Sequence, residues 1–173
     1  MMKLMGILLV LGAGGAIGIR QSYRMRAKVR EIRSVIQVLT SLESQIVYAQ
    51  VVLGDAFLQG AVSANETCIK RFFCCIGDEL SANRRCAVTE AFAQARKELG
   101  GRMAIGAEEW SVLTFLSENL GRSDTDEMKK QIALAIEHLK LRERIAMEQV
   151  SRKEKLAIYL GICGALFIVL ICV

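Results

Sequence analysis

The residue types that most often carry chemistry are few in this chain of 173 residues, and they are not spaced for catalysis. His138 is the only histidine, so a histidine-based metal cluster or a Cys–His couple would depend on it alone. Four central cysteines form no C-x-x-C pair, and we expect them to be reduced and to pack as small core hydrophobes. They are Cys68, Cys74, Cys75 and Cys86. The sequence therefore predicts no catalytic residue, no metal site, no cofactor and no enzymatic activity.

The glycine-rich run GAGGAIG, at residues 12–18, is only superficially similar to a dinucleotide-binding turn. No second strand and no acidic ribose partner follow it, and it lies inside an apolar segment. Gly14 and Gly18 have the G-x-x-x-G spacing that favours close helix packing, and Gly161 and Ala165 repeat this spacing near the other end. We expect these four residues to form a helix-packing seam. Because the chain lacks a G-x-x-x-x-G-K-[ST] loop, any nucleotide hydrolysis would have to be done by a partner.

Two apolar segments, residues 4–19 and 156–173, lie at the ends of the sequence. A helix needs roughly 17 to 25 apolar residues to cross a bilayer, and the first segment reaches this length only with residues 1–3. The inner flank of each segment is basic, and basic flanks stay on the cytoplasmic side. The sequence thus predicts a cell-membrane protein with residues 20–155 in the cytosol and both termini outside. A cleaved signal peptide at the N-terminus is the alternative.

The positive charge is concentrated beside the apolar segments. The formal net charge is +5 and the isoelectric point is near 9.0. The two flanks, residues 20–33 and 140–155, hold twelve basic and four acidic residues, whereas residues 34–139 have a net charge of −4. This distribution favours membrane lipids over nucleic acid as a partner.

The complete absence of proline and the spacing of apolar residues predict an all-α protein. We expect a cytosolic bundle of about six helices, at residues 20–155, between transmembrane helices at residues 1–19 and 156–173. Asp55 is expected to cap a short helix, and Ser123 is expected to open a last helix that continues without interruption into the second apolar segment. The predicted core stripes are Val35, Ile36, Leu39, Leu42 and Ile46; Ile69, Phe72, Phe73 and Ile76; Phe92; Trp110, Leu113, Leu116 and Leu120; and Met128, Ile132, Ala135, Ile136 and Leu139.

Two long stretches of the sequence resemble one family. From residue 109 onward, EWSVLTFLSENLGRSD and LAIEHLKLRERIAMEQVSRKEKLAIYLGICGALFIVLICV resemble the stage III sporulation protein AB family of endospore-forming bacteria. LTSLESQIVYAQVVLGDAF, at residues 39–57, resembles the first helix and turn of that family. The family is in turn similar to one F domain of the platform proteins in type II secretion and type IV pilus machines. At residues 51–53 the chain departs from it, with VVL where the family often has proline and leucine.

The resemblance implies a platform in the channel apparatus between mother cell and forespore, made in the mother cell and placed in the outer forespore membrane. Such a platform would dock a secretion-type ATPase and organise other stage III sporulation membrane proteins, and a homo-oligomer is compatible with this role. Acidic turns at two places in the sequence are the hypothesised partner-binding parts. Their residues are Glu43, Tyr48, Asp55, Arg122, Asp124 and Asp126.

Two other functions are compatible with the sequence. The chain could be a two-anchor scaffold or signalling protein, which would need no ATPase, so the partners recovered with it would separate this reading from the platform. A membrane enzyme is the third reading, but the apolar segments hold no constellation of polar residues that would serve it.

Overall fold

The computed structural model describes the backbone of residues 2–46, 52–83, 86–120 and 125–172, and the side chains of 23–46, 52–83, 86–120 and 126–152. Within these residues it has six α-helices, one short 3-10 helix and no strand, so the all-α prediction is confirmed. The elements are α1 (Met2–Ser44), α2 (Leu53–Val62), α3 (Thr67–Ala82), α4 (Val88–Leu99), the 3-10 helix η2 (Gly100–Arg102), α5 (Ala107–Leu120) and α6 (Thr125–Cys172).

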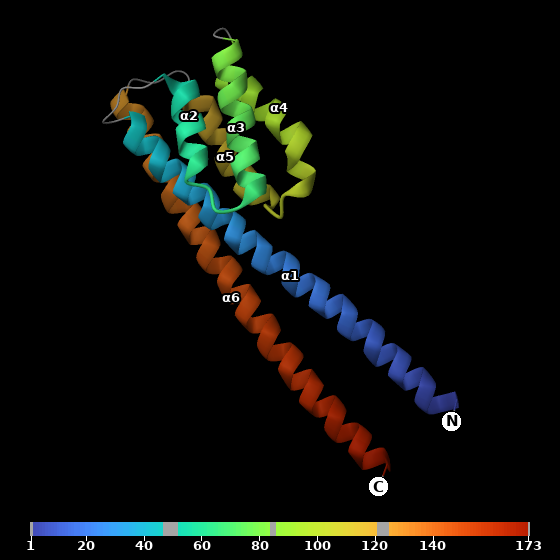
Figure 1. Ribbon diagram of the computed structural model, residues 1–173. Coiled ribbons are helices and arrows are strands. Elements are labelled where there is room, and N and C mark those ends of the chain that lie inside the picture. Colours follow the sequence, from blue (N-terminus) through green and yellow to red (C-terminus); the bar gives the residue numbers. More distant parts are fainter. Residues whose placement is uncertain (1, 47–51, 84–85, 121–124, 173) are drawn as a thin grey trace.

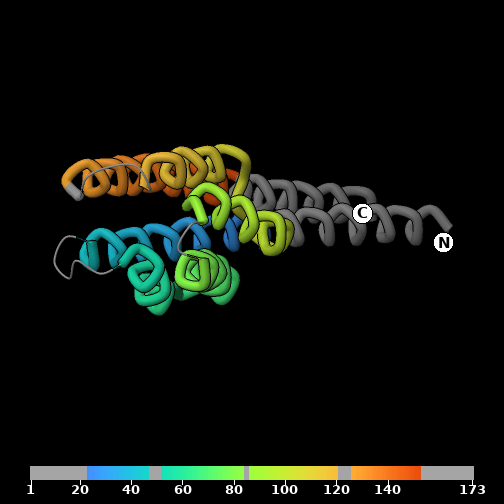
Figure 2. The backbone as a smooth tube through the Cα atoms, turned by 90° about the horizontal axis from the view of Figure 1, so that it is seen from above, coloured from blue at the N-terminus to red at the C-terminus, as the bar shows by residue number. Residues whose placement is uncertain are grey.

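Two long helices, α1 and α6, form the axis of the molecule and lie side by side (Figure 1). The four shorter helices α2 to α5 gather around one end of this pair, as the view from above also shows (Figure 2). Helices α2 and α3 pack on α1, and α5 packs on α6. Consecutive helices pack on one another, and the most extensive contact in the molecule joins the first and last helices, α1 and α6.

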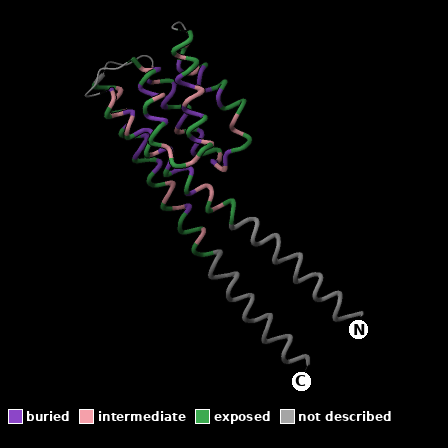
Figure 3. Tube along the Cα trace, viewed as in Figure 1, coloured by how far each residue is buried: buried purple, intermediate pink, exposed green. Residues whose placement is uncertain are grey.

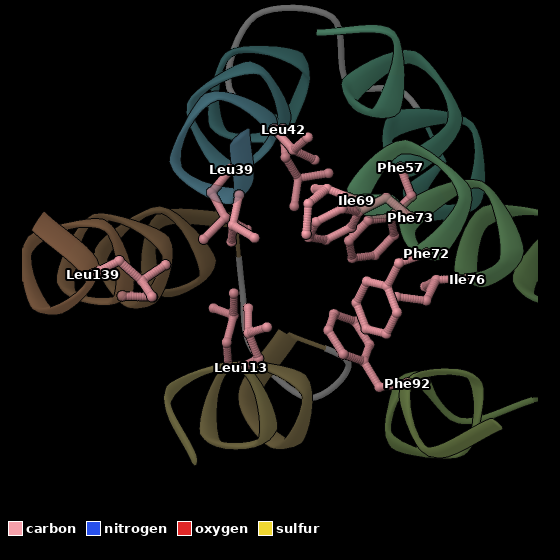
Figure 4. Packing of buried hydrophobic residues seen from close by; sticks show 14 of the residues in the cluster. Leu39, Leu42, Phe57, Ile69, Phe72, Phe73, Ile76, Phe92, Leu113 and Leu139 are labelled. Carbon is pink, nitrogen blue, oxygen red and sulfur yellow. The ribbon is translucent and has the colours of Figure 1, made fainter. Parts of the chain in front are cut away.

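The core lies where the four short helices meet the long pair. Buried residues of each described helix face one another in the bundle, whereas exposed residues cover its outside (Figure 3). The predicted stripes are buried as expected, except that Ile36 and Met128 are only partly buried. Five aromatic rings form the centre, from α2, α3, α4 and α5, and most neighbouring rings meet edge-on (Figure 4). They belong to Phe57, Phe72, Phe73, Phe92 and Trp110.

The predicted starts of two helices can be compared with the structure. Helix α2 begins at Leu53, with Val52 at its N-cap and no side chain capping it, so the prediction that Asp55 caps this helix is wrong. Asp55 instead lies in the first turn, where a negative charge is favourable next to the helix dipole. Ser123, the predicted start of the last helix, lies outside the described residues, and α6 is described from Thr125.

Helices α2 and α3 approach each other so closely that only glycine fits at their crossing. A Cβ atom on Gly77 would lie 2.7 Å from the side chain of Leu58 and 2.9 Å from the carbonyl oxygen of Gly54. These separations are shorter than van der Waals contact, so a methyl group there would force the two helices apart.

We therefore expect Gly77→Ala to lower the free energy of unfolding by about 1–3 kcal/mol, because the crossing would be overpacked. The matched control is Gly101→Ala, since a Cβ atom at Gly101 would meet nothing within 4 Å. Urea denaturation followed by circular dichroism measures both. Equal effects of the two substitutions would show that the crossing is not as tight as described.

The predicted cell-membrane localisation is wrong. Within the described residues, no helix combines the length and the apolar character that a membrane span requires. The side chains described in α1 and α6 include many charged ones, among them Arg26, Arg30 and Arg33 in α1. Such charges are costly in the hydrocarbon interior. The side chains of the two segments used for that prediction, at 4–19 and 156–173, lie outside the described residues. The predicted packing seam lies there too, with Gly14, Gly18, Gly161 and Ala165.

Candidate functional site

A buried carboxylate lies where the two long helices meet the start of α5. The side chain of Glu109 is only 2% exposed, yet it has charged partners from both long helices. Its Oε2 lies 2.9 Å from Nζ of Lys28 in α1, and its Oε1 accepts a hydrogen bond of 3.3 Å from Nε of Arg142 in α6. One side chain of α5 thus links α1 to α6.

The local sequence explains why Glu109 points inward. Gly106 precedes the first residue of α5, and its backbone N–H donates to Oε2 of Glu109 at 2.8 Å. A glutamate three residues into a helix that bonds back to the residue before the helix is one half of a capping box. A Cβ atom on Gly106 would lie 2.8 Å from Oε2 of Glu109 and 2.9 Å from Nζ of Lys28, so glycine permits the close approach.

A second buried carboxylate, that of Glu31, lies one turn after Lys28 in α1. Glu31 is 7% exposed, and its Oε2 accepts a hydrogen bond of 2.6 Å from the backbone N–H of Ala104. This bond fastens the connection before α5 to α1. Glu31 and Glu109 both bond to the connection before α5. We call these two residues and the charged residues Lys28, Glu108 and Arg142 the polar junction.

Burial raises the pKa of Glu31 above its ordinary value of 4.5, and the nearby Glu66 adds to the rise, whereas hydrogen bonds from Ala104 and Ile105 and the charge of Arg30 oppose it. The folded state therefore holds its proton more tightly than the unfolded state. The contribution of this group to stability is then largest at low pH and is lost as the pH rises through the folded pKa.

For this reason we expect the stability of the natural chain, relative to Glu31→Gln, to fall as the pH rises from about 4.5. Glutamine keeps an acceptor for the N–H of Ala104 but cannot ionise. The difference in free energy of unfolding, measured by urea denaturation at several pH values, provides the test. If the natural chain instead became more stable relative to Glu31→Gln as the pH rises, the polar junction would favour the ionised carboxylate of Glu31.

Other polar side chains of α1 also contact neighbouring parts of the bundle. Arg142 also pairs with the exposed Glu108. Nε of Arg33 lies 2.5 Å from Oε1 of Glu143 in α6. Further along, Ser34 Oγ accepts the backbone N–H of Glu66 at 3.2 Å, and the carboxylate of Glu66 pairs with Arg30 at 2.9 Å. α1 therefore contacts the α2–α3 connection, the start of α5 and α6 through polar side chains.

The polar junction is suited to holding the helices together. Its carboxylates are engaged by cations and backbone N–H groups, and the described residues contain no group of three or more His, Cys, Asp or Glu that could hold a metal ion. His138 is exposed. The four central cysteines are free and only partly buried, less than predicted. Burial, and then nearby carboxylates, raise the pKa of the Cys75 and Cys86 thiols, which makes them poor nucleophiles.

The partner-binding residues predicted from the sequence lie elsewhere. Glu43 is partly buried near the end of α1, and Asp55 and Asp126 are exposed in the first turns of α2 and α6. These helix ends lie at one end of the bundle, opposite the polar junction (Figures 1 and 2). We call Glu43, Asp55 and Asp126 the acidic end. Glu31 and Glu43 are twelve residues apart in one helix, which is about 18 Å along its axis. The other residues predicted for partner binding lie outside the described residues: Tyr48, Arg122 and Asp124.

The sequence interpretation missed the polar junction, although a signal for it was present. Glu109 precedes Leu113 and Leu116 at the spacing of the buried stripe of α5, and Glu31 precedes Val35 and Val38 in the same way in α1. A charged residue at a core position of a helix is seldom fully buried unless it is paired. The sequence analysis named no partner for Glu109, so its pairing with Lys28 and Arg142 was not foreseen.

The fold and the polar junction together define a class: an all-helical bundle built around two long helices that buried charges hold together. A model of the stage III sporulation protein AB family (spore_III_AB) matches residues 3–173 of the chain. The chain therefore belongs to the stage III sporulation protein AB family.

Two relatives agree with this assignment. The chain is 28% identical over 171 residues to a stage III sporulation protein AB of Bacillus subtilis (strain 168), and the match covers 99% of each chain. It is also similar to a solved structure of stage III sporulation protein AB (SpoIIIAB), with a TM-score of 0.65 and 27% identity. That match covers 72% of this chain and 97% of the other. The resemblance noted from residues 39–57 and from residue 109 onward is confirmed.

Proposed function

We propose that this chain is a platform component of the sporulation apparatus between mother cell and forespore. In this role it docks a secretion-type ATPase at the acidic end and organises other stage III sporulation proteins through its long helices. Membership of the sporulation family supports the biological setting. The likeness to the F domain of secretion platforms, inferred from the sequence, supports the docking of an ATPase.

One observation carries the mechanical part of the proposal: the buried Glu109 carboxylate contacts Lys28 of α1 and Arg142 of α6 together. A displacement of one long helix would stretch an ion pair whose carboxylate is shielded from water, so the start of α5 and the other helix move with it. Buried apolar residues of α1 and α6 continue this attachment along the bundle. The chain needs no chemistry of its own in this mechanism, because the ATPase supplies the work.

The docking is tested by the affinity of the full chain for the purified secretion-type ATPase of the same organism. The double substitution Asp55→Lys and Asp126→Lys reverses two exposed charges of the acidic end, and we expect it to weaken binding at least roughly tenfold, the equivalent of about 1.4 kcal/mol. The matched control is Glu137→Lys with Glu148→Lys, which reverses two exposed acidic residues of α6 that lie three or more turns from Asp126.

Three outcomes would contradict the proposed docking. The natural chain could fail to bind the ATPase, the acidic-end variant could bind as tightly as the natural chain, or the control could weaken binding equally. Absence of ATPase binding together with recovery of regulatory proteins would favour the scaffold or signalling function.

A further inference from the structure

A groove between α4 and α5 is lined by the residue types that dominate protein interfaces. It consists of two adjoining hollows of about 410 Å³ each, which share part of their lining. Its main residues, which define the α4–α5 groove, are Phe92, Arg96, Trp110, Thr114, Phe115 and Glu118. Phe92 points from α4 into the core (Figure 4) and also lines one of the two hollows. Trp, Arg and Phe in such a setting are typical of binding hot spots and interface cores.

Phe115 is the most unusual of these residues. It is 55% exposed, whereas Phe57, Phe72, Phe73 and Phe92 are all buried in the core. The guanidinium of Arg96 lies over the ring of Trp110, 5.0 Å from its centroid, and covers an indole that is itself 7% exposed. The groove therefore offers a projecting ring beside a cation that is stacked on a second ring.

The charges of the groove differ between its two ends. Arg96 and Lys97 of α4 lie at the end that holds Trp110, and Glu118 of α5 lies two turns of α5 further on. Among the described residues, none of these three side chains forms an ion pair. The groove is thus positive at one end and negative at the other.

This order of charges is complementary to itself across a two-fold axis. In a contact between two copies related by a two-fold axis, the same surface meets itself in reverse order. Trp110 and Glu118 are each four residues, about 6 Å, from Thr114 along α5. An axis near Thr114 would place Arg96 of each copy opposite Glu118 of the other, and Phe115, one residue from the axis, against the second copy's groove.

We propose that the α4–α5 groove is the contact between two copies of this chain. A partner with a surface of one charge would match only one end of the groove, whereas a second copy matches both ends. This inference does not depend on the platform function, because it involves neither the acidic end nor the polar junction. It specifies how the homo-oligomer considered from the sequence would form.

The test measures self-association of the full chain by sedimentation, and by the fluorescence of Trp110, the only tryptophan in the sequence. We expect Phe115→Ser, Arg96→Glu and Glu118→Arg each to weaken association at least tenfold. The matched control is Leu141→Ser, because Leu141 of α6 is 56% exposed and lies outside the groove.

Mixing the two charge variants makes the test specific. In Arg96→Glu positions 96 and 118 are both acidic, and in Glu118→Arg both are basic, while Lys97 is unchanged. Each pure variant therefore sets like charges against each other at these two positions, whereas an equimolar mixture should associate as the natural chain does. The double variant should also associate. A natural chain that stays monomeric, groove variants that associate normally, or a mixture that stays monomeric would overturn the proposal.

Discussion

Replacing Glu109 by glutamine is expected to lower the free energy of unfolding by about 3 kcal/mol, because it removes a buried charge from between two cations. Lys28 and Arg142 each keep 28% of their side chain exposed, so water can partly compensate them, which places the loss at the lower end of the range for broken buried pairs. Glutamine retains an acceptor for the N–H of Gly106 and nearly the same volume. The loss of stability therefore measures the effect of removing the charge and not an effect on packing.

Glu108 provides the matched control for this substitution. It precedes Glu109 and also pairs with Arg142, but its side chain is 65% exposed. Exposed pairs contribute about 0–1 kcal/mol, so Glu108→Gln should change stability by less than about 1 kcal/mol. Urea denaturation of both variants at neutral pH measures the difference. Equal losses would show that burial of Glu109 does not make its ion pairs important.

Leu139→Ala is expected to cost about 2–5 kcal/mol, because it removes a large side chain from a fully packed position of α6. Leu139 is 1% exposed and lies on the face of α6 that belongs to the core (Figure 4). The result also bears on the proposed mechanism, because this face holds α6 to the bundle. A loosened α6 would be expected to give fewer mature spores even where the chain remains folded.

The control for Leu139 lies two residues further along the same helix. Leu141 is 56% exposed, so Leu141→Ala should change stability by less than about 0.5 kcal/mol. Thermal unfolding followed by circular dichroism compares the two variants, and spore counts compare their effect in cells. Similar losses from both substitutions would contradict the described orientation of α6.

The spacing of apolar residues was sufficient to predict most of the fold. The stripes through Leu39, Phe72 and Leu113 indicate amphipathic helices, because apolar residues recur every three to four positions in a chain without proline. Helix capping was less predictable: an aspartate near a helix start can cap the helix or occupy its first turn, and Asp55 does the latter.

The polar junction was harder to predict because its residues are far apart in sequence. Lys28, Glu109 and Arg142 belong to three helices, and a single sequence does not show which charges will meet after packing. Only the position of Glu109 in an apolar stripe pointed to a buried ion pair. The α4–α5 groove was not foreseen either, since Phe115 and Arg96 are unremarkable residues until the two helices are placed side by side.

In the proposed mechanism, binding of an ATPase at the acidic end is transmitted to the polar junction. Hydrogen exchange of the full chain, measured with and without the purified secretion-type ATPase, tests it most directly. We expect altered exchange near Asp55 and Asp126 and also at residues 28–31, 104–109 and 142–147. The second set of changes should be lost in Glu109→Gln. Binding that alters exchange only at the acidic end, or no binding, would contradict it.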